Sequence, residues 1–210
     1  MNRLQLIALP TSPFAARLHI QLLEKGLDWE FEYPQNQTRA SEHAAINPFA
    51  RSPILLNGPD YLIESAAIAE YLEDQHPLPT LRGSTAWATA RMRGFIAALD
   101  QYFFPQLFRL RALKAGDPAM PGVVVELHEV LARLELLSDG ENYVCDHHLT
   151  LADCALLPAC FYLDFFLGRH HQTNWRTQHP RLADWWTTML KHKTVQQVLA
   201  HLHASLPPAR

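Results

Sequence analysis

The sequence predicts two parts, an α/β layer built on a single sheet followed by an all-helical half. Roughly the first 80 residues alternate between strand-like and helix-like stretches. The segment Gln75–Ser84 ("QHPLPTLRGS") then breaks the pattern with two prolines and a glycine, and no convincing strand follows it. The 210 residues are enough for two small domains, each with a core. We therefore place the domains at residues 1–76 and 85–210, with a linker at 77–84.

The first half is expected to follow the order βαβ, then a short helix, a hairpin and a final helix. Apolar residues recur at helical spacing from Pro13, and Gly26 is a typical helix stop. Asn57–Asp60 has turn composition between two apolar runs. The expected elements are strand Arg3–Leu9, helix Pro13–Lys25, strand Trp29–Tyr33, a short helix in Ser41–Ile46, strands Ile54–Leu56 and Tyr61–Ile63, and helix Ala66–Asp74.

The second half is expected to contain only helices. Thr150-Leu151-Ala152-Asp153 has the form of a capping box, with a hydroxyl residue at the N-cap and an acid three residues later. Pro105 is a candidate kink inside the first long helix. The expected helices cover Thr85–Lys114, Pro118–Leu137, Leu151–Leu167 and Pro180–Leu202.

Composition argues for a globular protein of the cytoplasm. The net charge of −3 gives no reason to expect nucleic acid as a partner. No apolar run looks long enough to span a bilayer, and the N-terminus lacks the layout of a signal peptide. Three cysteines are no disulfide framework and suit a reducing compartment.

Twelve histidines raise the question of a metal site. The adjacent pairs His147–His148 and His170–His171 are the obvious candidates. On a helix or a strand, neighbouring side chains diverge, so neither pair is expected to converge on one ion. No metal site is predicted.

Three short stretches of the first half could carry chemistry. Ser12 precedes Pro13 at a helix start, where it either caps the helix or helps the free amides hold an anion. Ser52–Pro53 opens a strand, and a cis bond there would turn the backbone of Ser52 toward an extended peptide ligand. Glu64–Ser65 is either a helix-capping pair or a clamp for the ammonium and carboxylate of an amino acid.

These three stretches occur in an order and at a spacing that resemble the cytosolic glutathione transferase family. The resemblance covers essentially the whole chain and has the serine-type, bacterial-like arrangement of zeta- and omega-like members. Similar family signatures are "EKG" (Glu24–Gly26), "NPFARSP" (Asn47–Pro53), "ESAAIAEYL" (Glu64–Leu72) and "LTLADCALLP" (Leu149–Pro158).

The resemblance implies a thioredoxin-like first domain that binds glutathione. Pro53 would be the family's cis-proline, and Ser12 would face the sulfur, with Thr11 as the neighbouring alternative. The backbone of Ser52 would pair with the cysteinyl unit. Glu64 and Ser65 would hold the γ-glutamyl end. The candidates for the glycine carboxylate are Arg51, Arg39 and His43.

The resemblance further implies conjugation of the glutathione thiolate to a small electrophile by a homodimeric cytoplasmic enzyme. The alternatives are a glutathione-dependent isomerase or peroxidase, or a non-catalytic binding or regulatory protein with the same fold. The intact Ser12, Glu64 and Ser65 argue against the non-catalytic alternative. The candidate residues of the electrophile pocket are Phe14, Tyr102, Phe108, Arg109 and Phe161.

Overall fold

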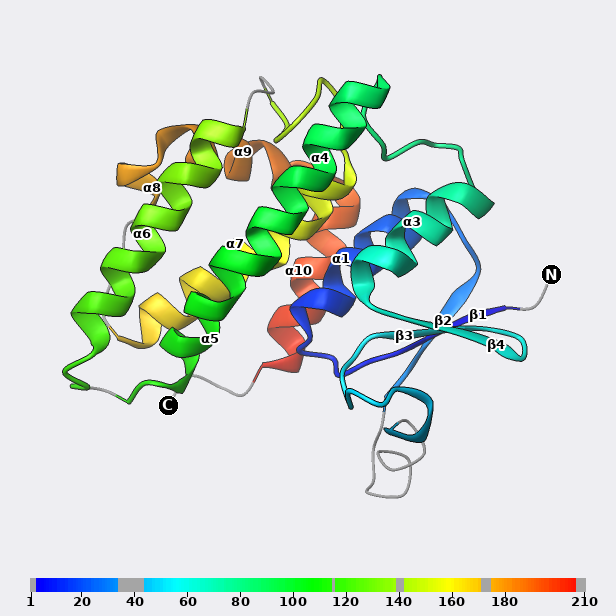
Figure 1. The fold of residues 1–210 in the computed structure, drawn as a ribbon, viewed down its shortest axis with the longest axis horizontal. Coiled ribbons are helices and arrows are strands. Elements are labelled where there is room, and N and C mark those ends of the chain that lie inside the picture. Colours follow the sequence, from blue (N-terminus) through cyan, green and yellow to red (C-terminus); the bar gives the residue numbers. More distant parts are fainter. Residues whose placement is uncertain (1–2, 34–43, 115, 139–141, 171–174, 207–210) are drawn as a thin grey trace. The chain divides into compact units, whose positions relative to one another are not determined.

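The computed structural model describes residues 3–33, 44–114, 116–138, 142–170 and 175–206 (Figure 1). The chain divides into two compact units. The first consists of Met1–Thr80 with Thr194–Pro207, and the second of Leu81–Lys193 with Pro208–Arg210. The helical domain predicted at residues 85–210 includes the last helix, whereas Thr194–Pro207 groups with the first unit.

A four-stranded mixed sheet forms the centre of the first unit. Its strands lie in the order β2-β1-β3-β4, with β1 parallel to β2 and antiparallel to β3. The β3–β4 hairpin closes over Gly58–Pro59, where Gly58 takes a φ of 64° that favours glycine. The predicted βαβ unit and hairpin are thereby confirmed. The strands are β1 (Leu4–Ile7), β2 (Trp29–Glu32), β3 (Ile54–Asn57) and β4 (Asp60–Ile63).

Helices α1 (Pro13–Glu24) and α3 (Ser65–Gln75) pack against each other over the sheet (Figure 1). A buried polar network joins them. The Nζ of Lys25 lies 2.9 Å from Oε1 of Glu73, and Nε2 of Gln21 donates to the same oxygen at 3.0 Å. A buried charge is tolerated when it is paired and hydrogen-bonded, so this network holds the relative position of the two helices. Of the short helix expected in Ser41–Ile46, residues 44–46 are helical and the rest lies outside the described residues.

The last helix, α10 (Lys193–Ser205), completes the core of the first unit with an aromatic cluster. The ring of His201 stacks on Phe31 with centroids 5.2 Å apart. His19 of α1 meets Trp29, Phe31 and His201 edge-on, at 4.9, 5.0 and 5.4 Å. Burial, and secondarily repulsion from His201, lower the pKa of His19 to about 4. At neutral pH His19 therefore packs as an uncharged aromatic residue.

The second unit contains only helices among its described residues, as predicted (Figure 1). The expected single stretch Thr85–Lys114 is interrupted by a π-helical turn, η1, directly before Pro105. Proline lacks an N–H and its ring excludes the carbonyl four residues earlier, so the helix widens at this point. The helices are α4 (Ala86–Ala98), η1 (Leu99–Phe103), α5 (Phe104–Ala112), α6 (Met120–Leu137), α7 (Leu151–Arg169), α8 (Trp175–Gln178) and α9 (Pro180–Met189).

Two expectations for the helical half are wrong in detail. The predicted helix Pro180–Leu202 is two helices, α9 and α10, separated at residues 190–192, and the short helix α8 was not expected. The α7 helix is long and apolar enough to span a membrane, contrary to the expectation that no such run exists. However, 83% of its 18-residue apolar window is buried inside the fold. It is apolar on all sides because it is the central helix of the unit.

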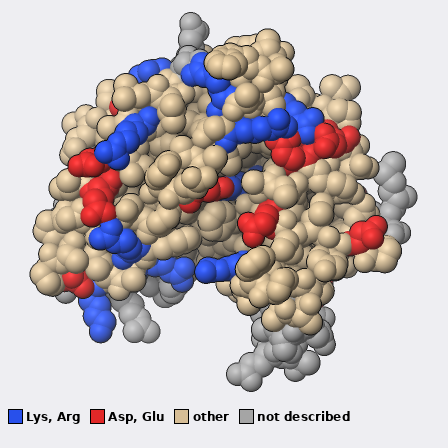
Figure 2. All heavy atoms as spheres, in the orientation of Figure 1, with Lys and Arg blue, Asp and Glu red and all other residues tan. Residues whose placement is uncertain are grey.

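One face of the molecule carries charges of both signs. Figure 2 shows one face on which lysine and arginine are interleaved with aspartate and glutamate.

Candidate functional site

Ser12 lies at the junction between β1 and α1. It has the extended backbone of an N-cap residue, and its Oγ accepts a hydrogen bond from the amide of Ala15 at 3.2 Å. The capping interpretation is therefore confirmed. Because a hydroxyl oxygen has two lone pairs and one hydrogen, this bond leaves the hydrogen available to donate. Capping and contact with an anion are thus compatible in one side chain. Thr11 is half-buried one residue before the cap.

The Ser52–Pro53 bond is cis, as the sequence predicted. The preceding loop is organised by Asn47, which is 1% exposed. Its Nδ2 donates to the carbonyl of Arg51 at 2.7 Å and its Oδ1 accepts from the amide of Phe49 at 3.0 Å. Sequence reasoning missed this role, although an asparagine before a proline is a common signal for a structured turn.

Glu64–Ser65 does not cap its helix. Glu64 is exposed, and its side chain makes no capping hydrogen bond. Its backbone has φ 68° and ψ 111°. A non-glycine residue in such a conformation costs about 1–3 kcal/mol, and residues of this kind gather at functional sites. Ser65 is buried as the first residue of α3. The prediction that Ser65 is the N-cap is therefore wrong, because Glu64 occupies that position without a side-chain capping bond. The clamp stays a prediction.

Arg17 contributes a positive charge that the sequence analysis did not assign to the site. It is 4% exposed, and its Nη1 lies 3.5 Å from Oγ of Ser65. Its guanidinium also lies over the ring of Phe14, at 5.0 Å from the centroid. Together with the amides of the first turn of α3, this cation favours an anion at Ser65. The signal that could have identified Arg17 is that it is a charged residue at a buried position of α1.

The strand register brings the three junctions to one end of the sheet. Ile7, the last residue of β1, pairs with Ile54, the first residue of β3. Ile54 in turn pairs with Ile63, the last residue of β4. The loop to Ser12, the Ser52–Pro53 bond and the Glu64–Ser65 turn therefore continue from three adjacent strand ends. Three strands span about 10 Å, which is also the length of an extended tripeptide.

For several predicted site residues, the structure shows no contact that places them at the sheet end where Ile7, Ile54 and Ile63 pair. Arg39 and His43 lie outside the described residues. Arg51 is exposed beside the cis bond. The electrophile-pocket candidates divide between the two units, with half-buried Phe14 in the first and the other four in the second.

Within the second unit, those four candidates have different surroundings. Phe161 is buried in α7, whereas Tyr102 is 61% exposed. Phe108 packs on Phe104, with ring centroids 5.8 Å apart. Arg109 forms an ion pair with Glu126 of α6, so its charge is already matched.

Comparisons with known proteins cover both halves of the chain. Residues 6–80 match the glutathione S-transferase N-terminal domain, and residues 117–186 match the glutathione S-transferase C-terminal domain. Glutathione S-transferase 3 of Zea mays is 29% identical over 227 aligned positions, which cover 100% of this chain and 99% of that protein. A stringent starvation protein A homologue of Pasteurella multocida is 25% identical over 70% of this chain and 69% of its own.

Structural comparison gives the same family. The apo structure of glutathione S-transferase III superposes with a TM-score of 0.80 and 25% identity, over 100% of both chains. The sheet order β2-β1-β3-β4 and the helical second unit are the architecture that the sequence resemblance implied. The chain belongs to the cytosolic glutathione S-transferase superfamily.

Proposed function

We propose that this protein is a glutathione S-transferase that conjugates the thiolate of glutathione to a small electrophile. The observation that carries the proposal is the register that aligns Ser12, Ser52–Pro53 and Glu64–Ser65 at the ends of three adjacent strands. The three strand ends together span about the length of a tripeptide. The residues at these ends match the chemical groups of glutathione in order. The family membership supports the same activity.

The γ-glutamyl end of glutathione carries both an ammonium and a carboxylate, and each meets a group of opposite charge or a hydrogen-bond donor. Glu64 is exposed and acidic, which suits the γ-glutamyl ammonium. The γ-glutamyl carboxylate meets Ser65, the first amides of α3 and the nearby Arg17. The backbone of Ser52 pairs with the cysteinyl unit. For the glycine carboxylate, Arg51 is the candidate among the described residues, with Arg39 and His43 as alternatives.

Ser12 activates the thiol by favouring its anion. Its hydroxyl donates to the thiolate while the oxygen keeps its bond to Ala15. A hydrogen bond to a charged group contributes about 1.5–3 kcal/mol, or about one to two pKa units on the thiol. The thiolate then attacks the electrophilic carbon. A carbon–sulfur bond forms, and either a leaving group departs with its electron pair or an activated double bond takes up a proton.

A test of this role is the ultraviolet absorbance of bound thiolate against pH. Ser12→Ala should raise the thiol pKa by about one to two units, since the anion loses a donor. Thr11→Ala is the matched control and should change the pKa little. If Thr11→Ala moves the titration and Ser12→Ala does not, Thr11 is the residue that faces the sulfur. If neither moves it, Ser12 is only a helix cap.

Other chemistry could use the same thiolate. An isomerase or a peroxidase would need the same Ser12, so a panel of electrophiles, isomerisable substrates and hydroperoxides distinguishes them. The similarity to a stringent starvation protein A homologue keeps a non-catalytic regulatory role as a second candidate. Calorimetric titration with glutathione separates it, because a protein without a glutathione site gives no binding heat.

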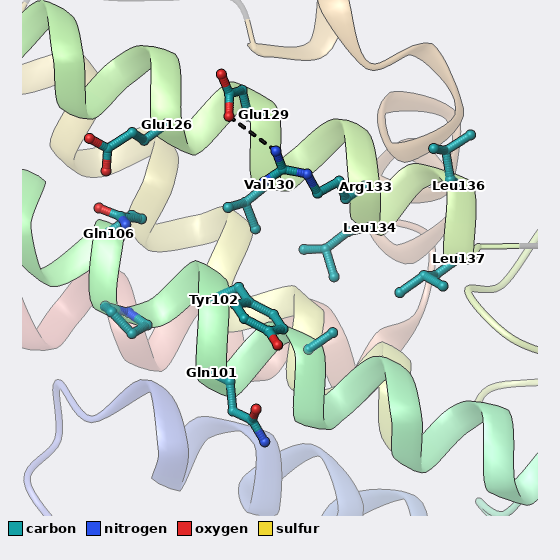
Figure 3. Close-up of a pocket in the computed structure, with 12 residues that line it drawn as sticks. Gln101, Tyr102, Gln106, Glu126, Glu129, Val130, Arg133, Leu134, Leu136 and Leu137 are labelled. Atoms are coloured by element: carbon teal, nitrogen blue, oxygen red, sulfur yellow. Dashed lines mark hydrogen bonds and ion pairs between the residues drawn. The ribbon is translucent and has the colours of Figure 1, made fainter.

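We further propose that the cytoplasmic protein forms a homodimer through a groove in its second unit. The groove has a volume of about 560 Å³ and lies between the η1–α5 segment and α6 (Figure 3). Its wall includes the exposed apolar side chains Tyr102, Leu136 and Leu137, which are 61%, 82% and 46% exposed.

A second copy is the occupant that fits this groove. Figure 3 shows Glu129 and Arg133 paired on the same wall as Leu136, so the surface has apolar groups and both charges. A two-fold interface places the same patch of both copies against each other, so apolar groups and both charges on one patch can meet their counterparts there.

Sedimentation velocity tests the dimer. Leu136→Glu should convert the protein to a monomer, because it places a charge in the apolar contact. Val125→Glu, on the same helix but outside the groove, is the control and should leave the dimer intact. A wild-type monomer at micromolar concentration, or a dimer that survives Leu136→Glu, contradicts the proposed interface.

A further inference from the structure

The segment before α7 holds Asp146, His147 and His148 in an arrangement that the sequence analysis did not expect. The segment bends continuously and is neither helix nor strand, so the argument that neighbouring side chains diverge does not apply. The two imidazole rings lie 5.0 Å apart. Their Nδ1 atoms lie 2.5 and 3.8 Å from the same carboxylate oxygen, Oδ1 of Asp146. One donor atom from each residue lies within 4.8 Å of the others.

Asp146 is a preorganised anion. Its side chain is 6% exposed, and its Oδ2 accepts a hydrogen bond from the amide of Ser84 at 2.7 Å. Its Oδ1 accepts from the amide of His147 at 2.7 Å. These two hydrogen bonds fix the positions of both carboxylate oxygens. The carboxylate is therefore held in place by the backbone.

His148 is held in the tautomer that a metal ligand needs. Its Nε2 lies 2.9 Å from the carbonyl oxygen of Arg82, which can only accept, so Nε2 carries the hydrogen. In the neutral ring, Nδ1 then has a lone pair, and it faces the carboxylate of Asp146. Two acceptors that face each other are stabilised by a cation between them. Histidine ligands of metals usually donate their other N–H to a carbonyl or a carboxylate in this way.

We propose that Asp146, His147 and His148 form a binding site for a divalent transition-metal ion of the Zn²⁺ type. Two imidazoles and one carboxylate favour zinc, nickel or copper over magnesium and calcium, which prefer oxygen ligands alone. Ligand atoms of a tetrahedral zinc ion lie about 3.3 Å apart, so each separation must change by no more than about 1.5 Å. The side chain of His147 is 78% exposed and can rotate to supply this change, with water as the fourth ligand.

Binding at this site would join two distant parts of the second unit. Asp146 and His148 already contact Ser84 and Arg82, at the beginning of the unit. A metal ion on the same side chains strengthens the attachment of the segment before α7 to residues 82–84. The site is separate from the groups proposed to bind glutathione and does not depend on that proposal.

A second close histidine pair provides the internal control. Nδ1 of His128 lies 3.0 Å from Nε2 of His179, and the other ring nitrogen of His179 lies 3.6 Å from Glu135. Among the residues that the structure describes, this pair has no third group with a ligand atom within 4.8 Å of both, and it offers only two ligands.

The experiment is a calorimetric titration of the full, tag-free chain with Zn²⁺ in the absence of glutathione, with Co²⁺ absorption as a second readout. Wild type should bind one ion per chain, and Zn²⁺ should raise its unfolding temperature. His147→Ala should weaken the affinity at least about tenfold. Because His147 is exposed, this variant should keep its circular dichroism spectrum and its unfolding temperature without metal. Asp146→Asn should have an effect of similar size.

His128→Ala should leave the zinc affinity unchanged. Zinc binding that is lost in His128→Ala and retained in His147→Ala would move the site to the other pair and overturn the proposal. Absence of one-to-one binding in the wild type would overturn it as well. Glutathione affinity should be the same in all of these variants, which separates failure of the metal site from failure of the proposed transferase.

Discussion

The helix starts of α3 and α7 have similar sequence signals and opposite structures. Both place a hydroxyl residue and an acid close together at the first turn, a pattern that is typical of helix capping. At α7, Asp153 is 1% exposed and accepts hydrogen bonds from the amides of Thr150 and Val144 at 2.7 and 2.8 Å. The hydroxyl of Thr150 and Nε1 of Trp185 also donate to it, both at 2.8 Å. At α3, Glu64 is exposed, makes no capping bond and has a φ of 68°.

The difference separates an acid with several hydrogen-bond donors inside the protein from an exposed acid that we propose binds a ligand. Asp153 has four donors from three parts of the second unit, so its role is to hold the fold together. Glu64 stands in a costly backbone conformation that its own helix does not need. Position near a helix start does not distinguish these roles, whereas the partners of the carboxylate do.

The largest expected effect is on the stability of the second unit. Asp153→Ala leaves three N–H donors and one hydroxyl without their acceptor inside the core, so the free energy of unfolding should fall by about 3–5 kcal/mol. Urea unfolding measures it. Asp184→Ala, an exposed acid on α9, is the control and should change stability by less than about 0.5 kcal/mol. A loss of similar size in both variants would show that Asp153 stabilises the second unit no more than an ordinary exposed acid does.

The next effect is on binding. Glu64→Gln removes the charge that we propose faces the γ-glutamyl ammonium, so glutathione affinity should fall about ten- to a hundredfold, the equivalent of about 1.5–3 kcal/mol. The unfolding free energy should stay close to that of wild type. Asp60→Asn, an exposed acid in the same hairpin, should keep wild-type affinity in the same calorimetric titration. Unchanged glutathione affinity in Glu64→Gln would show that the charge of Glu64 does not contribute to binding.

The smallest expected effect separates the backbone strain at Glu64 from the proposed role of its side chain in binding. Glycine adopts positive φ freely, so Glu64→Gly should relieve strain and raise the free energy of unfolding by about 1 kcal/mol. It should nevertheless weaken glutathione binding as much as Glu64→Gln does. Urea unfolding and calorimetry on the same preparation test both parts. A glycine variant that is less stable than wild type would show that the backbone of Glu64 is not strained.

Parts of the fold and of the candidate site could be predicted from short stretches of sequence. Ser12 as N-cap, the cis Ser52–Pro53 bond and the Thr150–Asp153 capping box all depend on residues within a few positions of each other. The roles of Arg17 and Asn47 were missed. Arg17 acts through Ser65, which lies 48 positions away, and Asn47 acts through a turn geometry that its residue type alone does not specify. The functional assignments of Ser12, Ser52, Glu64, Ser65 and Arg51 remain predictions.

The sequence by itself determined the order of strands and helices in the first half, the helical character of the second half, and the family. It did so because apolar periodicity, proline and capping signals act over one or two turns of chain. Only the tertiary structure decided that Ile7, Ile54 and Ile63 end or begin their strands side by side, and that α10 completes the first unit. It also decided that His147 and His148 converge on Asp146. Those arrangements depend on strand register, on packing between distant segments and on the bends of an irregular loop, which local sequence signals do not encode.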